Sequence, residues 1–409
     1  MEGLFFRLAW RNVWRNPRRS IITISAVASS VVFAVFIQSL SRGTRDGMID
    51  NLIRHSTGYM QIQDYRFQEN PSMDNVFFYD DRIVDRIRQA TPSLDLVLPR
   101  IDTFMLAAGE QVSRGAMVSG IDADKEHRFS NIRDYTIKGR FFTPGEAGAV
   151  IGRGLAERLG LGLGESLVLI GKGRFGMSAS GIFPIVGVVD HPLPKINQQV
   201  VYLPLETAQA LLSAKGYVSS LQLVPGRKTN TESIAGAIRK ELENEDLRVY
   251  TWQDFMPEFL NYMKIDMAGA YLMSFILYIV VGFGFFGTVL TMTMNRLKEF
   301  AILLSIGMSR SRLAVVVLLE TFCISLIGVI CGIVAAFGVI CYFYRRPLEL
   351  KGNAAEALIE RGWSPELFVS FAPDLFYVQG IIIFFIAMAV FLYPLIKIST
   401  LDNLKAAKS

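Results

Sequence analysis

The sequence is poor in charge, in cysteine and in histidine. Charged residues make up only 19% of the 409 positions, whereas apolar residues make up 51%. The three cysteines lie together in one apolar stretch, so the long polar part of the chain must fold without disulfide bonds. The three histidines, His55, His127 and His191, have neither the i, i+4 partner nor the paired cysteines of a zinc site. We therefore expect no metal centre.

Enzymatic motifs are also missing from the sequence. It has no G-x-S-x-G nucleophile elbow. Residues 171–176 fit the spacing G-x-G-x-x-G, but a second strand-like run follows them instead of a helix. Met177 also stands where a Walker A loop needs its lysine. We interpret this segment as the tip of a β-hairpin, and we predict no catalytic residue, no metal and no cofactor bound by this chain.

Long apolar runs dominate what is present. Four of them are long enough to cross a bilayer as helices, namely residues 21–40, 268–291, 313–343 and 377–397. The formal net charge is +5, and the basic residues gather beside these runs. That placement indicates membrane topology rather than nucleic-acid binding.

The basic residues also predict which side of the membrane each flank occupies. They are concentrated in residues 1–20, 292–312 and 398–409, whereas the short loop 344–376 carries four of them. We therefore expect both termini and residues 292–312 in the cytoplasm, and residues 41–267 and 344–376 on the opposite side. Residues 1–20 show an arginine at every fourth position beside an aromatic stripe, which predicts an interfacial amphipathic helix or a simple positively charged anchor.

Residues 41–267 predict a domain of mixed α/β character. Strand-like runs occur near residues 59–63, 166–170, 182–189, 200–203 and 220–224. Helical patterns occur near residues 81–90, 154–159, 205–214 and 231–243. The stretch 252–264 is expected to run directly into the second span as a rigid stalk. The predicted fold class is an α-helical membrane protein with four transmembrane helices and a large mixed α/β extracytoplasmic domain between helices 1 and 2.

Small residues and one acidic residue stand out within the spans. Ser25 and Ser29 in the first span, and Gly328 and Gly332 in the third, have the spacing that lets neighbouring helices approach closely. Glu320 lies inside the third span, where a carboxylate is costly. We expect it to pair with a basic group at the base of the bundle; the alternative is that it reaches out to the cytoplasmic interface.

Several segments together resemble a known family. Residues 295–308 resemble the cytoplasmic signature of the FtsX/MacB/LolC-E superfamily of ABC permeases, with departures at Ala301 and Leu304. Glu320 with its two following glycines, residues 149–165, residues 201–205 and the closing residues 401–405 are similar to further motifs of that superfamily. Residues 57–62 look like the lipoprotein-releasing LolC/LolE branch.

The resemblance implies a machine of two permeases and two cytoplasmic ABC ATPases, which bind the Mg-ATP. Such a machine works by mechanotransmission in a bacterial inner membrane, and its extracytoplasmic domain is of the Porter/Sabre type. It contacts membrane lipids, a lipoprotein cargo and a periplasmic carrier, but no nucleic acid. The alternatives are MacB-like efflux of a small molecule or peptide with a periplasmic adaptor, and FtsX-like control of a cell-wall hydrolase.

The resemblance also implies roles for particular side chains. The residues expected to couple to the ATPase are Asn295, Arg296, Lys298, Glu299, Phe300, Ile302, Leu303, Gly307 and Met308. The residues expected to admit cargo between the first two spans are Phe33, Phe36, Ile37, Leu40, Met267, Tyr271 and Phe275, although core packing or lipid contact would explain them equally well. The residues expected to dock a carrier are Lys172, Arg174 and Phe175.

Overall fold

A computed structural model describes residues 2–226, 231–243, 245–360 and 366–399. The closing motif at residues 401–405, and most of the expected tail 398–409, lie outside the described residues. The chain divides into two compact units. We call them the helical unit (Met1–Gly47, Met263–Glu349 and Glu366–Ser409) and the sheet unit (Met48–Tyr262 and Leu350–Pro365).

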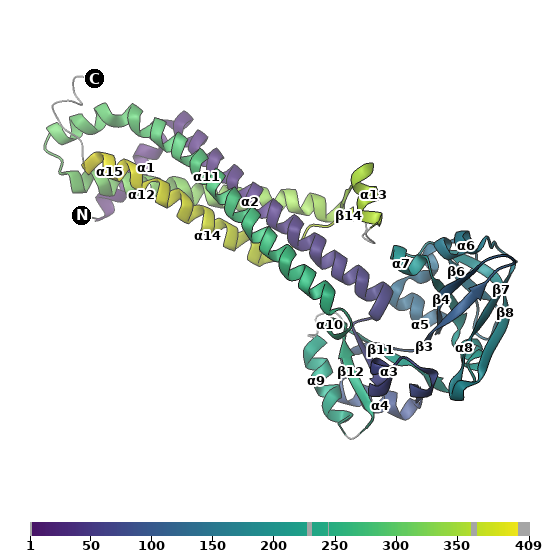
Figure 1. The fold of residues 1–409 in the computed structure, drawn as a ribbon. Helices are drawn as coiled ribbons and strands as arrows, with labels where there is room; N and C mark the ends of the chain where they lie inside the picture. The colour runs from purple at the N-terminus through teal and green to yellow at the C-terminus, as the bar shows by residue number, and fades with distance from the viewer. Residues whose placement is uncertain (1, 227–230, 244, 361–365, 400–409) are drawn as a thin grey trace. The chain divides into compact units, whose positions relative to one another are not determined.

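Four helices in the described residues are long and apolar enough to cross a membrane, as the sequence predicts. The spans lie in α2 (Pro17–Leu52), α11 (Pro257–Ser305), α12 (Arg310–Arg345) and α14 (Pro373–Val390). Two shorter helices, α1 (Glu2–Arg15) and α15 (Leu392–Ser399), flank them. Figure 1 shows the long helices running as a bundle. α2, α11 and α14 each begin at or beside a proline, because a proline at the first helical position needs no hydrogen-bond partner for its nitrogen.

The helices run well past the predicted spans. Backbone hydrogen bonds inside a helix need no apolar side chains, so a helix continues where hydropathy falls. One expected helix is interrupted. The stretch 252–264 does not run unbroken into the second span, because α10 (Trp252–Phe255) ends at Met256, and Pro257 starts α11.

The first helix belongs to the bundle and does not only lie at the membrane surface. α1 packs against α12, and Val13 is buried in a cluster with Cys323 and Ile324. The Ser20 hydroxyl donates to the Val13 carbonyl at 2.5 Å, which fixes the corner between α1 and α2. Trp10 and Trp14, on the opposite side of α1, are exposed. The predicted helix in residues 1–20 thus has one side packed on the bundle and one side exposed, and its place at the membrane interface stays a prediction.

Two glycines set the distance between α2 and α12. A Cβ atom on Gly328 would lie 2.6 Å from the Cβ of Val27, and one on Gly332 would lie 2.7 Å from the Cβ of Val31. Such distances are far below normal carbon contacts, so only glycine allows this approach. Ser25 and Ser29 are exposed on this chain and do not face these glycines, because α2 presents its valines to them instead.

The sheet unit contains one ten-stranded sheet. Its strands are β1 (Met60–Asp64), β3 (Leu94–Ala108), β4 (Ser113–Ile121), β5 (Thr136–Gly139), β6 (Ala149–Gly152), β7 (Ser166–Lys172), β8 (Ser178–Val189), β9 (Val200–Pro204), β11 (Ser220–Pro225) and β12 (Leu247–Thr251). The helices around it are α3 (Tyr65–Glu69), α4 (Asp81–Ala90), α5 (Ala123–Ser130), α6 (Arg153–Leu159), α7 (Pro194–Asn197), α8 (Leu205–Leu211) and α9 (Thr231–Glu241). Further elements of the sheet unit are β2 (Phe77–Phe78), β10 (Tyr217–Val218) and α13 (Asn353–Glu360), whereas β13 (Leu348–Glu349) and β14 (Glu366–Leu367) belong to the helical unit.

Part of the sheet closes on itself. β7 pairs with both β3 and β8, so the path β3–β4–β9–β6–β8–β7 returns to β3 as a barrel. Side chains such as Met105, Leu167 and Val201 fill a buried core with α6 and α8. β11, β1 and β12 extend the sheet beyond β3 and pack their own core against α4 and α9, while β5 pairs with β8 outside the barrel. The predicted mixed α/β domain is thus present.

Candidate functional site

The segment expected to couple to an ATPase is helical over most of its length. It was predicted as a loop, but α11 continues to Ser305 and α12 begins at Arg310. The turn between them is made by Gly307, whose φ of +100° is a conformation that favours glycine. A helix–turn–helix corner therefore replaces the expected loop.

The corner exposes some of the predicted coupling residues and buries others. Exposed positions are Asn295, Lys298, Ile302, Leu303 and Gly307, while Glu299 and Met308 are half-buried. Arg296 and Phe300 face the bundle and are only 7% and 3% exposed. The burial repeats every fourth residue, as one face of a helix requires. The exposed set offers a surface for a partner, whereas the two buried residues cannot contact one directly.

Arg296 instead supplies the basic partner of Glu320. Its Nη1 atom donates to both carboxylate oxygens of Glu320 at 2.8 Å. Glu320 is 4% exposed, and the space left around the pair is only about 10 Å³. A buried charge of this kind is tolerated only when it is paired and hydrogen-bonded. Removal of either Arg296 or Glu320 would therefore leave the other as an unpaired buried charge and destabilise the bundle.

The ion pair continues into a network at this end of the bundle. Glu299 accepts from the Nη2 atom of Arg15 at 2.8 Å and lies 3.6 Å from the Nε atom of Arg296. Arg19 lines the same small cavity as Arg296 and Glu320. Residues of α1, α2, α11 and α12 thus meet around two carboxylates. The places of Arg15 and Arg19 in this network could not be predicted from the sequence, since both look like ordinary positive charges beside a membrane span.

The expected cargo route between α2 and α11 is closed in this structure. The two helices lie side by side, and Gln38 hydrogen-bonds to the hydroxyl of Ser274 at their middle. Thr23 donates to the Met292 sulfur at 3.7 Å near one end, and the guanidinium of Arg45 lies 3.7 Å from Asp266 near the other. These contacts join the helices along their length.

The seven side chains expected to admit cargo fall into two groups. Phe33, Ile37, Tyr271 and Phe275 are exposed, and Met267 is half-buried. Phe36 and Leu40 instead pack against the bundle core, with the Phe36 ring 5.4 Å from that of Phe343. The structure therefore leaves the exposed group available to an apolar ligand and assigns the other two residues to packing.

The segment 171–181 is a hairpin tip, as predicted. β7 and β8 pair in register up to Lys172 and Ser178, and no helix follows the glycines. Phe175 is 74% exposed and has a φ of +59°. The guanidinium of Arg174 lies 3.5 Å from the centre of the Tyr217 ring and 4.6 Å from that of Phe175. This stacking fixes the position of Arg174 and leaves Phe175 and Lys172 as the exposed residues of the expected carrier site.

A polar cluster occupies the middle of the sheet unit. The guanidinium of Arg100 lies 2.5 Å from Glu126, and the hydroxyl of Ser119 donates to Asp102 at 2.5 Å. The rings of His55 and His191 meet edge to face at 5.8 Å, beside a cavity of about 150 Å³. Burial, with the neighbouring His55, lowers the pKa of His191 to about 3. In the described residues, no group of three or more metal-ligating side chains could hold an ion.

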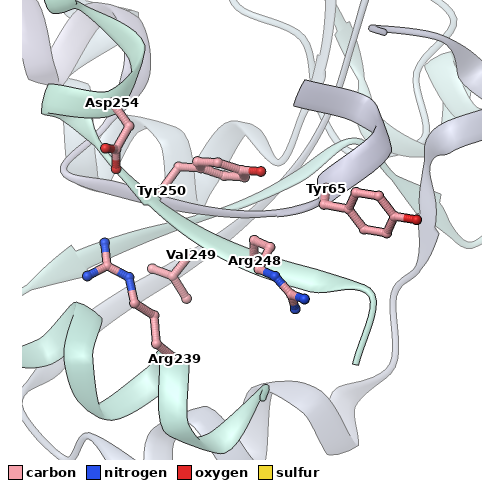
Figure 2. A pocket seen from close by; sticks show the side chains of 6 residues that line it. All are labelled: Tyr65, Arg239, Arg248, Val249, Tyr250 and Asp254. Atoms are coloured by element: carbon pink, nitrogen blue, oxygen red, sulfur yellow. The ribbon is translucent and has the colours of Figure 1, made fainter. Parts of the chain in front are cut away.

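A shallow pocket lies beside β12 (Figure 2), with a volume of about 450 Å³. It is lined by Tyr65, Arg239, Arg248, Val249, Tyr250 and Asp254. The charged groups are already used. Arg239 pairs with Glu232 at 2.8 Å, Arg248 donates to the carbonyl of Glu245, and Asp254 caps α10 through Thr251. The side chains of Arg239, Arg248 and Asp254 are thus held by contacts within the sheet unit.

Comparison with known proteins supports the division of the chain. Residues 20–241 match the family model of the MacB-like periplasmic core domain, and residues 271–402 match that of the FtsX-like permease C-terminal region. The chain is 20% identical to the lipoprotein-releasing system transmembrane protein LolC of Neisseria meningitidis, over 80% of this chain and 79% of that protein. It is 24% identical to the uncharacterized ABC transporter permease protein Rv0987 of Mycobacterium tuberculosis, over 79% of this chain but only 36% of that protein.

Two solved structures are also similar. One is the extracellular domain of the noncanonic ABC-type transporter YknZ from Gram-positive bacteria, at 16% identity and a TM-score of 0.34, covering 47% of this chain and all of that one. The other is the periplasmic region of MacB from Actinobacillus actinomycetemcomitans, at 12% identity and a TM-score of 0.36, covering 53% and 98%.

The first family match covers more than half of the chain, and the second follows it in the order that the fold requires. Members of this family are the non-catalytic membrane subunits of ABC transporters, which agrees with the four membrane-crossing helices described above. The chain belongs to the FtsX/MacB/LolC superfamily of ABC transporter permeases.

Proposed function

We propose that this permease extracts lipoproteins from the inner membrane and passes them to a periplasmic carrier. The observation that carries the proposal is the similarity to LolC, which extends over most of both chains. Two copies of the permease, or this chain with a related one, would work with two cytoplasmic ABC ATPases that bind Mg-ATP. In this arrangement both termini and the corner between α11 and α12 face the cytoplasm, in keeping with the basic flanks of the spans.

The proposed mechanism is mechanical and needs no reaction in this chain. Closure of the ATPases displaces the exposed surface of the corner, which includes Lys298, Ile302 and Leu303. α11 has no break between Pro257 and Ser305, so displacement of one end is passed along its axis. The hydrogen bond between Gln38 and Ser274 then breaks, and α2 and α11 separate. The exposed side chains Phe33, Ile37, Tyr271 and Phe275 accept the acyl chains that enter between the two helices.

The first test is purification of the tagged chain in a mild detergent, with mass spectrometry of the proteins and lipids that copurify. An ABC ATPase together with acylated lipoproteins supports the proposal. The complex is then placed in nanodiscs with a labelled lipoprotein, and ATP-dependent release to a soluble carrier is measured. Recovery of an ATPase without release of any lipoprotein would contradict it.

A matched pair of variants tests the route. Phe275→Ser removes an aromatic ring from the proposed route, and Phe283→Ser removes one that is equally exposed two turns further along α11. We expect release to fall with the first variant and to persist with the second. Equal effects would show that the rings only contact lipid.

A second candidate function is MacB-like efflux of a small molecule or peptide through a periplasmic adaptor. The match of residues 20–241 to the MacB-like periplasmic core domain favours it. Copurification of an adaptor instead of lipoproteins would support this function. Copurification of a cell-wall hydrolase would instead support an FtsX-like role.

A further inference from the structure

The ionic network at the end of the bundle has more basic than acidic members. Arg15, Arg19 and Arg296 surround the carboxylates of Glu299 and Glu320. Two of the arginines have a carboxylate within 2.8 Å. In the part of the chain that the structure describes, Arg19 makes no ion pair, and its buried Nε atom has no hydrogen-bond partner.

Arg19 is nevertheless close to the acidic groups. It lines the cavity of about 10 Å³ that also contains Arg296 and Glu320. An unpaired guanidinium that is partly buried beside a paired carboxylate is an unfavourable arrangement by itself. The arrangement becomes favourable in a state in which the Glu320 carboxylate pairs with Arg19.

We propose that Glu320 exchanges its partner during the ATP-driven cycle, from Arg296 in the state seen here to Arg19 when the corner between α11 and α12 is displaced. The proposal rests on the proposed coupling to an ATPase. Arg296 is on α11, which carries the corner, whereas Arg19 is on α2 and Glu320 is on α12. Movement of α11 relative to α12 therefore pulls Arg296 away, and Arg19 replaces it.

Exchange of partners lowers the free-energy cost of separating Arg296 from Glu320. Loss of one partner from a buried ion pair leaves an uncompensated charge, which is strongly unfavourable. A second arginine in the same cavity keeps Glu320 paired in both states, and Arg296 retains Glu299, which lies 3.6 Å from its Nε atom, when it leaves Glu320. Arg15 on α1 pairs with Glu299 of α11, and this exposed pair can break and re-form as α11 moves. Arg19 and Glu320 are thus positioning residues, which act through the corner and not on ATP.

The test compares neutral variants of two adjacent arginines in the complex of the full chain with its copurified ATPase. Arg19→Gln removes the second partner of Glu320, and Arg18→Gln removes an exposed charge next to it. We expect Arg19→Gln to lower ATP hydrolysis at least about fivefold, while its thermal midpoint without ATP equals that of the parent. Arg18→Gln should change neither, and Arg19→Lys should restore most of the activity because it keeps the charge.

Two results would overturn the exchange. One is an Arg19→Gln complex that hydrolyses ATP as fast as the Arg18→Gln complex. The other is an Arg19→Gln chain that loses as much thermal stability without ATP as Glu320→Gln, because Arg19 would then support the resting state. A chain that purifies without any ATPase would refute the proposed function itself, and the exchange with it. The outcomes of the two proposals are thus distinguishable.

Discussion

The close approach of α2 and α12 predicts opposite effects for the same substitution at different glycines of one helix. At Gly328 and Gly332 an added Cβ would meet the Cβ atoms of Val27 and Val31 at 2.6 and 2.7 Å. At Gly338, on the same helix, an added Cβ would meet nothing within 4 Å. Replacement by alanine gains about the same helix propensity at all three positions, up to about 1 kcal/mol.

The difference in stability between these variants and Gly338→Ala therefore measures the cost of the added Cβ between α2 and α12. Normal carbon contacts begin near 3.5 Å, so α2 and α12 would have to separate by about 1 Å at each substituted glycine. Overpacking of this kind typically costs about 1–3 kcal/mol. We expect Gly328→Ala and Gly332→Ala to be less stable than Gly338→Ala by about that amount each.

The assay is reversible unfolding of the purified chain in mixed micelles by increasing concentrations of SDS, followed by tryptophan fluorescence. The midpoints for Gly328→Ala and Gly332→Ala should fall below that of the parent, whereas the midpoint for Gly338→Ala should equal or exceed it. If Gly328→Ala unfolds at the same midpoint as Gly338→Ala, α2 and α12 do not touch at this position, and the packing described here is refuted.

Other predictions concern the corner between α11 and α12, the sheet unit, and the contact of Gly43 in α2 with residues 368–370. Glu299→Lys should reduce ATP hydrolysis by the complex, and adding Arg15→Glu should restore it by re-forming the pair; thermal stability should change by less than about 1 kcal/mol, because the pair is exposed. Neutral His191 stabilises the fold above about pH 6.5, and this is lost as the pH falls toward 3, since only the unfolded state is protonated there. Between about pH 7 and pH 5 the parent should lose about 2 kcal/mol more than His191→Gln in urea titrations. Gly43→Ala should lower the thermal midpoint, because its Cβ would overlap backbone atoms of residues 368–370.

The membrane-crossing helices could be predicted from the sequence because hydropathy and length decide them. Their ends could not be predicted in the same way. α11 continues from Met294 into the charged segment up to Ser305, where hydropathy indicates a loop. The buried face of α11 does follow a helical pattern, since Arg296, Phe300 and Leu304 recur every fourth residue and are all buried. Read as one helical stripe, that spacing predicts that Arg296 points into the bundle.

The sheet unit was predicted in part, for a related reason. The run of β9 is almost wholly apolar, and that of β11 sets Leu221 and Leu223 on either side of Gln222, so both look like strands. β3 was missed because Pro99, Arg100 and Asp102 interrupt its apolar pattern. In the structure Arg100 is paired with Glu126 and Asp102 with Ser119, so those charges are compatible with a central strand. Pairing between distant segments determines their burial, and no local pattern shows it.

The packing of the bundle indicates which helix moves in the proposed cycle. In the most apolar stretch of α12, 44% of the residues are buried within this chain, compared with 17% in that of α11. α12 also holds the glycines that contact α2, so displacement of α12 would disturb a dense interface. α11 is held to α2 in part by separate polar contacts, such as those of Gln38 with Ser274 and of Arg45 with Asp266. Because separate polar contacts break and re-form at lower cost than a close-packed seam, we expect α11 to move against a fixed α2–α12 pair in the proposed cycle. Glu320, on the fixed side, is then the place for the proposed exchange of arginines.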